Sequence, residues 1–146
     1  RQNLDEFRQS RDTKSKNNLC ENGVYCVASN SEKPEFAIFA SGSEVNIAVE
    51  AYQELEKCDK TVRIYSVPCL DYFNSQDKKF RESIINNASR NMVIEAGVSQ
   101  GWDKILRDNG VFIGMSSFGA SGPYKELYKN FKITKEHIMD VILNNK

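Results

Sequence analysis

The segment Phe36–Glu44 reads Phe-Ala-Ile-Phe-Ala-Ser-Gly-Ser-Glu, and it joins a strand pattern directly to a helix pattern. The apolar run Phe36–Ala40 is typical of a strand that is buried on both faces. Ser41 and Glu44 have the spacing of a capping box, in which each side chain accepts a free backbone N–H at a helix start. Apolar residues then recur on one helical face as far as Leu55.

The rest of the chain repeats this alternation of strands and helices, which predicts a parallel sheet with right-handed crossovers and helices on both faces. A short turn around Pro34 joins the first two strands, so the first strand is expected to be antiparallel or at an edge. Leu70–Ser75 is predicted to be a loop. The other strands are predicted at Val24–Ala28, Val62–Val67, Asn91–Ala96 and Val111–Met115, and the other helices at Asp77–Asn87, Gly101–Asp108, Pro123–Phe131 and Lys135–Asn144.

Length and charge limit the classes of function. A chain of 146 residues is long enough for one domain with a real core. The 20 acidic and 20 basic residues give no net charge, which argues against a general nucleic-acid binder. No apolar run approaches the roughly 20 residues of a membrane span. Residues 1–22 are polar and charge-dense, so we expect a linker or strap from a preceding domain, followed by the domain proper at residues 23–146.

The four cysteines, Cys20, Cys26, Cys58 and Cys69, form no CxxC pair, so a zinc site is not expected. Three of them lie in or beside apolar runs, as small buried thiols do. With no signal-peptide pattern at the start of the chain, this favours a reducing, cytoplasmic location with free thiols. A disulfide pair stays open, because sequence does not fix proximity.

Two turns that follow strands and precede helices are candidate anion sites. Ser41–Glu44 contains one glycine and matches neither a dinucleotide fingerprint nor a phosphate loop, so helix capping is favoured there. In the second turn, Gly119 and Gly122 allow unusual backbone angles, Ser121 suits an N-cap and Pro123 suits a first helical turn. This turn is either a structural connection or an anion cradle.

Single residues give weaker indications of a functional site than these turns do. Glu95 ends a strand, where a carboxylate could act as a general base, but an ion pair or helix cap is favoured because no second catalytic group lies beside it. His137 is the only histidine and follows the expected N-cap Thr134, which favours an exposed first-turn residue over a catalytic one. Trp102 is predicted in the core. Tyr72 and Phe73 are expected to cover the core or a partner domain.

An ordered series of motifs resembles the C-terminal domain of transketolase along essentially the whole chain. The series is Arg1-Gln-Asn-Leu, Phe39-Ala-Ser-Gly-Ser-Glu-Val, Ser66-Val-Pro-Cys, Phe73 with Gln76-Asp77, Arg81-Glu-Ser, Glu95-Ala-Gly, Gly101-Trp102 and Gly114-Met-Ser-Ser-Phe-Gly-Ala-Ser. The resemblance implies a three-layer α/β/α domain with a five-stranded mixed sheet in the order 1-3-2-4-5 and the first strand antiparallel.

The resemblance also implies a function for the parent enzyme. Transketolases are homodimers of the pentose phosphate pathway that transfer a two-carbon ketol unit between sugar phosphates, using thiamine diphosphate and Mg²⁺ or Ca²⁺. In that family the two preceding domains hold the cofactor, the metal and the catalytic residues. This fragment is therefore expected to be inactive alone and to serve structural, interdomain and dimer roles.

In its Arg-Gln-Asn-Leu motif, Arg1 matches the family's arginine that binds the sugar phosphate, so the resemblance implies this role for it. A planar guanidinium suits the role because it pairs with phosphate oxygens. The family usually has proline after Arg-Gln-Asn-Leu, whereas Asp5 stands here, so the path of residues 5–22 is open. Two alternatives remain: an autonomous module that binds an anion or regulatory ligand at one of the two turns, or the same domain from a related thiamine diphosphate enzyme such as dihydroxyacetone synthase or deoxyxylulose phosphate synthase.

Overall fold

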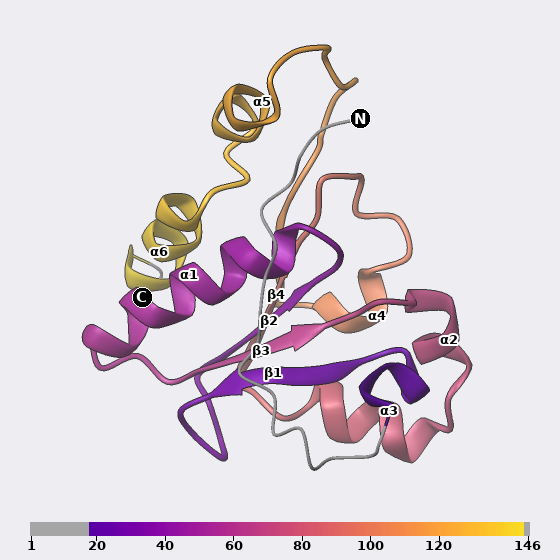
Figure 1. Ribbon diagram of the computed structural model, residues 1–146. Helices are drawn as coiled ribbons and strands as arrows, with labels where there is room; N and C mark the ends of the chain where they lie inside the picture. The colour runs from indigo at the N-terminus through magenta and orange to yellow at the C-terminus, as the bar shows by residue number, and fades with distance from the viewer. Residues whose placement is uncertain (1–17, 145–146) are drawn as a thin grey trace.

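The computed structural model describes residues 18–144 and contains one mixed sheet. The strands are β1 (Tyr25–Ser29), β2 (Phe36–Ala40), β3 (Val62–Ser66), β4 (Arg90–Ile94) and β5 (Val111–Ile113), in the order β1-β3-β2-β4-β5. The edge strand β1 pairs antiparallel with β3, and the remaining pairs are parallel (Figure 1). The predicted α/β fold class, its strand order and its antiparallel first strand are therefore confirmed.

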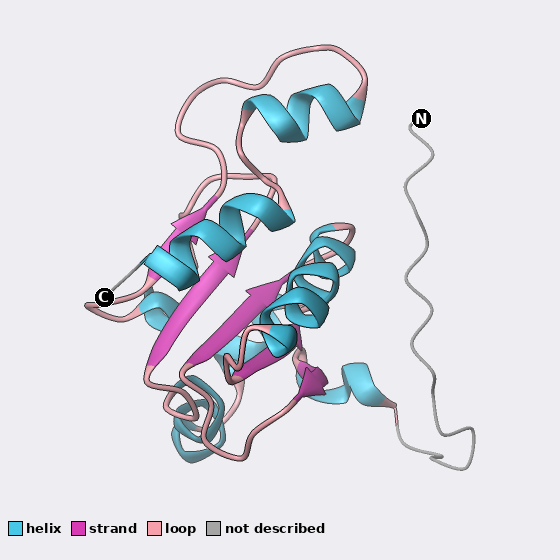
Figure 2. Ribbon diagram, turned by 90° about the vertical axis from the view of Figure 1, so that its left-hand side faces the viewer, coloured by secondary structure: helices cyan, strands magenta, loops and turns pink. Residues whose placement is uncertain are grey.

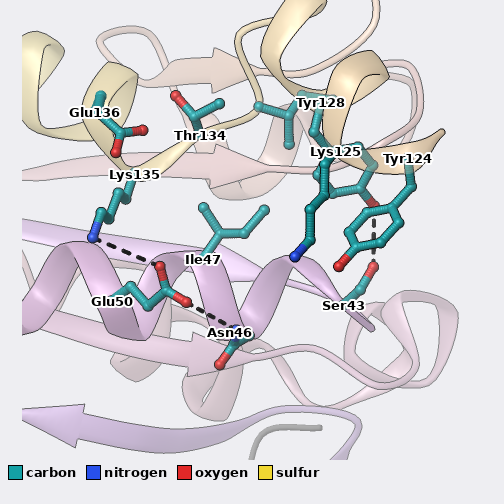
Figure 3. A pocket seen from close by; sticks show the side chains of 11 residues that line it. Ser43, Asn46, Ile47, Glu50, Tyr124, Lys125, Tyr128, Thr134, Lys135 and Glu136 are labelled. Atoms are coloured by element: carbon teal, nitrogen blue, oxygen red, sulfur yellow. Dashed lines mark hydrogen bonds and ion pairs between the residues drawn. The ribbon is translucent and has the colours of Figure 1, made fainter. Parts of the chain in front are cut away.

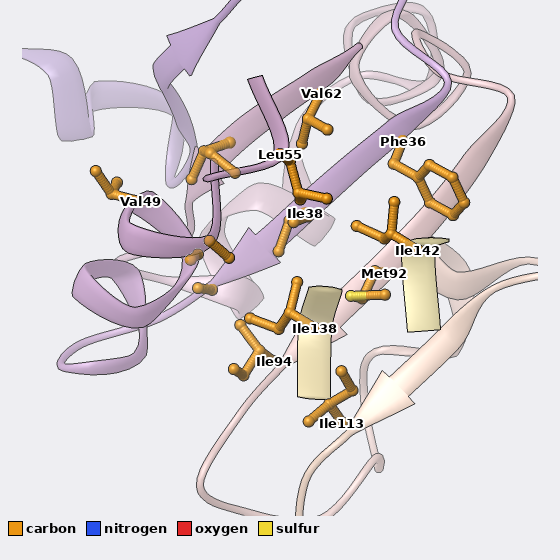
Figure 4. Packing of buried hydrophobic residues seen from close by; sticks show 14 of the residues in the cluster. Phe36, Ile38, Val49, Leu55, Val62, Met92, Ile94, Ile113, Ile138 and Ile142 are labelled. Atoms are coloured by element: carbon orange, nitrogen blue, oxygen red, sulfur yellow. The ribbon is translucent and has the colours of Figure 1, made fainter. Parts of the chain in front are cut away.

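Helices cover both faces of the sheet (Figure 2). They are the 3₁₀ helix η1 (Leu19–Asn22) and the α-helices α1 (Glu44–Lys57), α2 (Leu70–Ser75), α3 (Lys78–Ile85), α4 (Asp103–Leu106), α5 (Tyr124–Asn130) and α6 (Lys135–Asn144). On one face, α1 and α6 pack on the alternate side chains Ile38 of β2 and Met92 and Ile94 of β4 (Figure 4). On the other face, α2, α3 and α4 pack on Phe39 and its neighbours.

The order of the strands creates a switch point between β2 and β4. The chain leaves β2 toward α1 on one face of the sheet and leaves β4 toward α4 on the opposite face. The two connections therefore diverge at the carboxyl ends of these strands, which is the place where open α/β sheets bind their ligands.

The prediction of a loop at Leu70–Ser75 was wrong, because these residues form α2. The segment is too short to show a helical period, yet its Phe73 is 0% exposed and anchors the helix in the core. A close contact with η1 also holds it in place. Gly23, at φ +76°, ends η1 so near α2 that an added Cβ would lie 2.6 Å from the Cys69 carbonyl oxygen. Residues 19–22, which were predicted to belong to the linker, therefore form a 3₁₀ helix that lies against α2.

Candidate functional site

The switch point between β2 and β4 is bridged by a hydrogen bond between side chains that are far apart in sequence. The Ser41 hydroxyl, directly after β2, donates to the Glu95 carboxylate, directly after β4, at 2.6 Å. Ser41 follows buried β2, and Glu95 is held by its backbone N–H, which donates to the Ile113 carbonyl at 3.0 Å. The Ser41 turn and Glu95 were predicted as two separate candidate sites, and the structure brings them into contact. Among the described residues, Glu95 is paired with a hydroxyl and not with the predicted cation or helix end.

A second carboxylate, Glu44, lies in the first turn of α1 and is only 4% exposed. The Ser43 hydroxyl donates to its Oε1 at 2.7 Å, and the phenol of Tyr128 in α5 donates to the same oxygen. The predicted capping box is therefore not formed, since Glu44 accepts from Ser43 and Tyr128 and Ser41 donates to Glu95. A carboxylate at the positive N-terminal end of a helix is nevertheless favourable.

Tyr128 is the residue of this cluster that sequence reasoning missed. Its hydroxyl oxygen lies 3.1 Å from the Ser43 hydroxyl, and it joins α5 to the start of α1. The pKa of Tyr128 is raised to about 12, mainly by burial and secondly by its hydrogen bond to Glu44. The phenol therefore stays protonated at neutral pH and remains a donor. Its helical spacing with apolar neighbours predicts only packing, because nothing local indicates a carboxylate partner elsewhere in the chain.

A cavity of about 370 Å³ adjoins this cluster between α1, α5 and α6. Tyr124, Lys125 and Tyr128 of α5 face the N-terminal half of α1, with Ser43 and Tyr128 joined at one end (Figure 3). At the other end, Lys135 Nζ lies 3.9 Å from the Glu50 carboxylate, to which the Asn46 amide also donates (Figure 3). The polar groups at both ends are thus largely paired with one another, as in an interface between packed helices.

Among the described residues, the cluster contains no serine–histidine pair of the kind used in nucleophilic catalysis. Ser41 has a carboxylate partner but no histidine to act as base, since His137 lies in α6, where its backbone N–H donates to the Thr134 hydroxyl. The prediction that His137 is exposed was wrong, because it is half-buried, whereas its first-turn position and the Thr134 cap are as predicted. Within residues 18–144, no group of three or more His, Cys, Asp or Glu side chains could hold a metal ion.

The second predicted turn does not form an anion cradle. Helix α5 begins at Tyr124 with Pro123 as its N-cap, and Ser121 is exposed and two residues too early to cap it. Neither Gly119 nor Gly122 has a positive φ. The turn is therefore a surface connection, and the N-cap prediction was wrong.

The remaining candidates fall into the core or onto the surface. Trp102 is 5% exposed and belongs to the core, as predicted. Phe73 is fully buried whereas Tyr72 is 50% exposed, so the two neighbours have different roles. All four cysteines are free but exposed, which contradicts the expectation of small buried thiols. Arg1 lies outside the described residues.

Comparison with known proteins decides the family. The model of the transketolase-like TK C-terminal domain matches residues 23–134. The chain belongs to the transketolase C-terminal domain family. Transketolase 2 of Aliivibrio fischeri is 38% identical over 96% of this chain and 21% of its own length. The chloroplastic transketolase of Solanum tuberosum is 40% identical over 80% of the chain and 16% of its own length.

Solved transketolases share the fold. The enzyme from Leishmania mexicana superimposes with a TM-score of 0.72 at 37% identity, covering 82% of this chain and 17% of that one. The enzyme from Campylobacter jejuni gives a TM-score of 0.74 at 32% identity, covering 84% and 18%. This transketolase C-terminal domain thus spans about a fifth of the length of the curated relatives.

The described residues do not fit thiamine diphosphate and its cation. The switch point carries the carboxylate of Glu95 beside the buried carboxylate of Glu44, and negative charge there would repel a diphosphate. The part of the chain at 18–144 also offers no cluster of three ligands for the cation. The same repulsion argues against the alternative of an anion module at the Ser41–Glu44 turn.

Proposed function

We propose that this chain is the C-terminal part of a transketolase, and that the parent enzyme transfers a two-carbon ketol unit between sugar phosphates in the pentose phosphate pathway. The observation that carries the proposal is family membership over most of the chain, combined with a switch point at which hydroxyls and carboxylates are paired with one another. The fragment alone is inactive, and the preceding domains of the parent hold thiamine diphosphate and Mg²⁺ or Ca²⁺. Titrating the chain with thiamine diphosphate and Mg²⁺ in a calorimeter tests this, since saturable binding would contradict it.

The domain's contribution is a docking surface at the carboxyl edge of the sheet. Three of its four exposed large hydrophobic side chains in the described region follow strands at this edge: Tyr72 after β3, Val98 after β4 and Phe118 after β5. Phe118 is 99% exposed, in a connection that projects beyond the sheet (Figure 1). We propose that the preceding domains of the parent cover this surface, because the relatives carry about four fifths of their length outside the matched region. In the homodimer, the domain also supports subunit association.

Substitution in the full-length parent tests this interface. Phe118→Ser and Val98→Ser should weaken the association of the domains and lower the thermal stability of the parent, because each removes apolar area from the contact. Leu143→Ser is the matched control, since Leu143 is 41% exposed on α6, outside the proposed surface. The proposal of this interface fails if all three variants behave alike or if none changes the parent.

We retain Arg1 as a proposed ligand of the substrate phosphate. In the parent, Arg1→Ala should raise the KM for phosphorylated substrates more than it lowers kcat, because a guanidinium–phosphate pair contributes to binding throughout the reaction. An unchanged KM would contradict the proposed role of Arg1.

A cytoplasmic location is also proposed, although the Solanum tuberosum relative is chloroplastic, and a fluorescent fusion would test it. No helix in the described region is long and apolar enough to cross a membrane.

A further inference from the structure

A cavity lined mainly by basic side chains lies between α3 and α4, away from the switch point. Its volume is about 330 Å³, near the lower end of the range for small-molecule sites. Helix α3 contributes residues at helical spacing, so they share one face, and α4 and the residue after it form the opposite wall. The lining consists of Lys78, Arg81, Glu82, Ile85, Asn86, Lys104 and Arg107.

The positive charge of this cavity is largely uncompensated. Glu82 is the one carboxylate among its described lining residues, and it lies 3.7 Å from Lys78. Arg81 donates through Nε to the Gln76 backbone carbonyl at 3.0 Å, which orients its guanidinium but leaves its charge unmatched. Arg81, Lys104 and Arg107 form no ion pair with the described residues, although the whole chain carries as many acidic as basic residues.

The backbone at Arg107 strengthens this observation. Arg107 ends α4 with φ +58° and ψ −164°, a conformation that is ordinarily restricted to glycine. Its N–H bonds to the Asp103 carbonyl at 3.0 Å, so this geometry is held by the helix end. Glycine would relieve the strain at this position. An arginine here costs stability and supplies a guanidinium to the cavity, which is typical of functional positions.

We propose that this cavity binds a small anion of the phosphate class with two or more negative charges. Arg81 and Arg107 present planar guanidinium donors that match phosphate oxygens, and Lys104 adds a point charge between them in sequence. The site is independent of the proposed function and lies on the face of the sheet covered by α2, α3 and α4. It places anion binding at side-chain cations and not at either of the helix-start turns.

Titration of the 146-residue chain with sodium phosphate and pyrophosphate, followed by amide chemical shifts, tests the proposal. Shifts should localise to α3 and α4, pyrophosphate should bind more tightly than phosphate, and glucose should cause no shift. Arg107→Gly and Lys104→Ala should each weaken pyrophosphate binding about tenfold or more, as expected for the loss of one charge-assisted contact. Lys79→Ala is the matched control, because Lys79 is exposed on α3 and does not line the cavity.

Arg107→Gly separates binding from folding. Because glycine suits this backbone conformation, the variant should unfold at the same or a higher urea concentration while its affinity falls. The proposal is overturned if pyrophosphate produces no localised shifts at millimolar concentration. It is also overturned if Lys79→Ala weakens binding as much as Arg107→Gly, since that would indicate diffuse attraction by surface charge.

Discussion

Replacing Tyr128 by Phe removes one hydroxyl from the cluster that joins α5 to the start of α1. That hydroxyl donates to Glu44, whose side chain belongs to a residue only 4% exposed, and Phe keeps the ring and its packing. A hydrogen bond to a charged group contributes about 1.5–3 kcal/mol to stability. For a chain of this size the change lowers Tm by about 3–12 °C. Urea unfolding at neutral pH, followed by circular dichroism, measures the loss in the free energy of unfolding.

Tyr72→Phe is the control, because Tyr72 is 50% exposed and lies outside the cluster. The pH dependence adds a second check. The pKa of Tyr128 is raised from 10.0 to about 12, so its hydroxyl contributes fully below pH 10 and loses its contribution as pH rises through about 12. The stability difference between wild type and Tyr128→Phe should shrink over that interval. A Tyr128→Phe protein as stable as the Tyr72→Phe control would refute the reasoning.

Two further predictions concern buried backbone contacts. Asn91 is 1% exposed and donates to the carbonyls of Ile85 at 2.9 Å and Ile105 at 2.7 Å, so Asn91→Ala should cost about 2–4 kcal/mol in the free energy of unfolding. An Asn91→Ala protein with wild-type stability would show that these bonds matter little. Gly23→Ala should destabilise more than Gly42→Ala: both have positive φ, but an added Cβ meets an atom at 2.6 Å at Gly23 and none nearer than 3.9 Å at Gly42. Thermal melts that give the reverse order would contradict this.

The strands were predictable because their apolar runs are local and strong. The bounds predicted for β2, Phe36–Ala40, agree with the structure, and β3 ends one residue before the predicted Val67. Helix α6 also has its predicted bounds. Helix α2 was predicted as a loop because six residues show too little hydrophobic periodicity to distinguish a short helix from a loop.

Some residues of the candidate site were predictable but their pairing was not, because its hydrogen bonds join residues that are far apart in sequence. Ser41 and Glu44 have capping-box spacing, yet the Ser41 hydroxyl is taken by Glu95, 54 residues away in sequence. Tyr128 reaches Glu44 across 84 residues. Local spacing indicates which groups lie near a helix start, but packing of distant elements decides which of them bond to one another.

The most direct test of the central proposal compares ketol transfer by this chain with transfer by its full-length parent. Both would be assayed with a ketose phosphate donor and an aldose phosphate acceptor, in the presence of thiamine diphosphate and Mg²⁺. Because the described residues offer neither a catalytic set nor a fit for the cofactor, we expect turnover by the parent and none by the chain. Turnover by the chain alone would contradict the proposal.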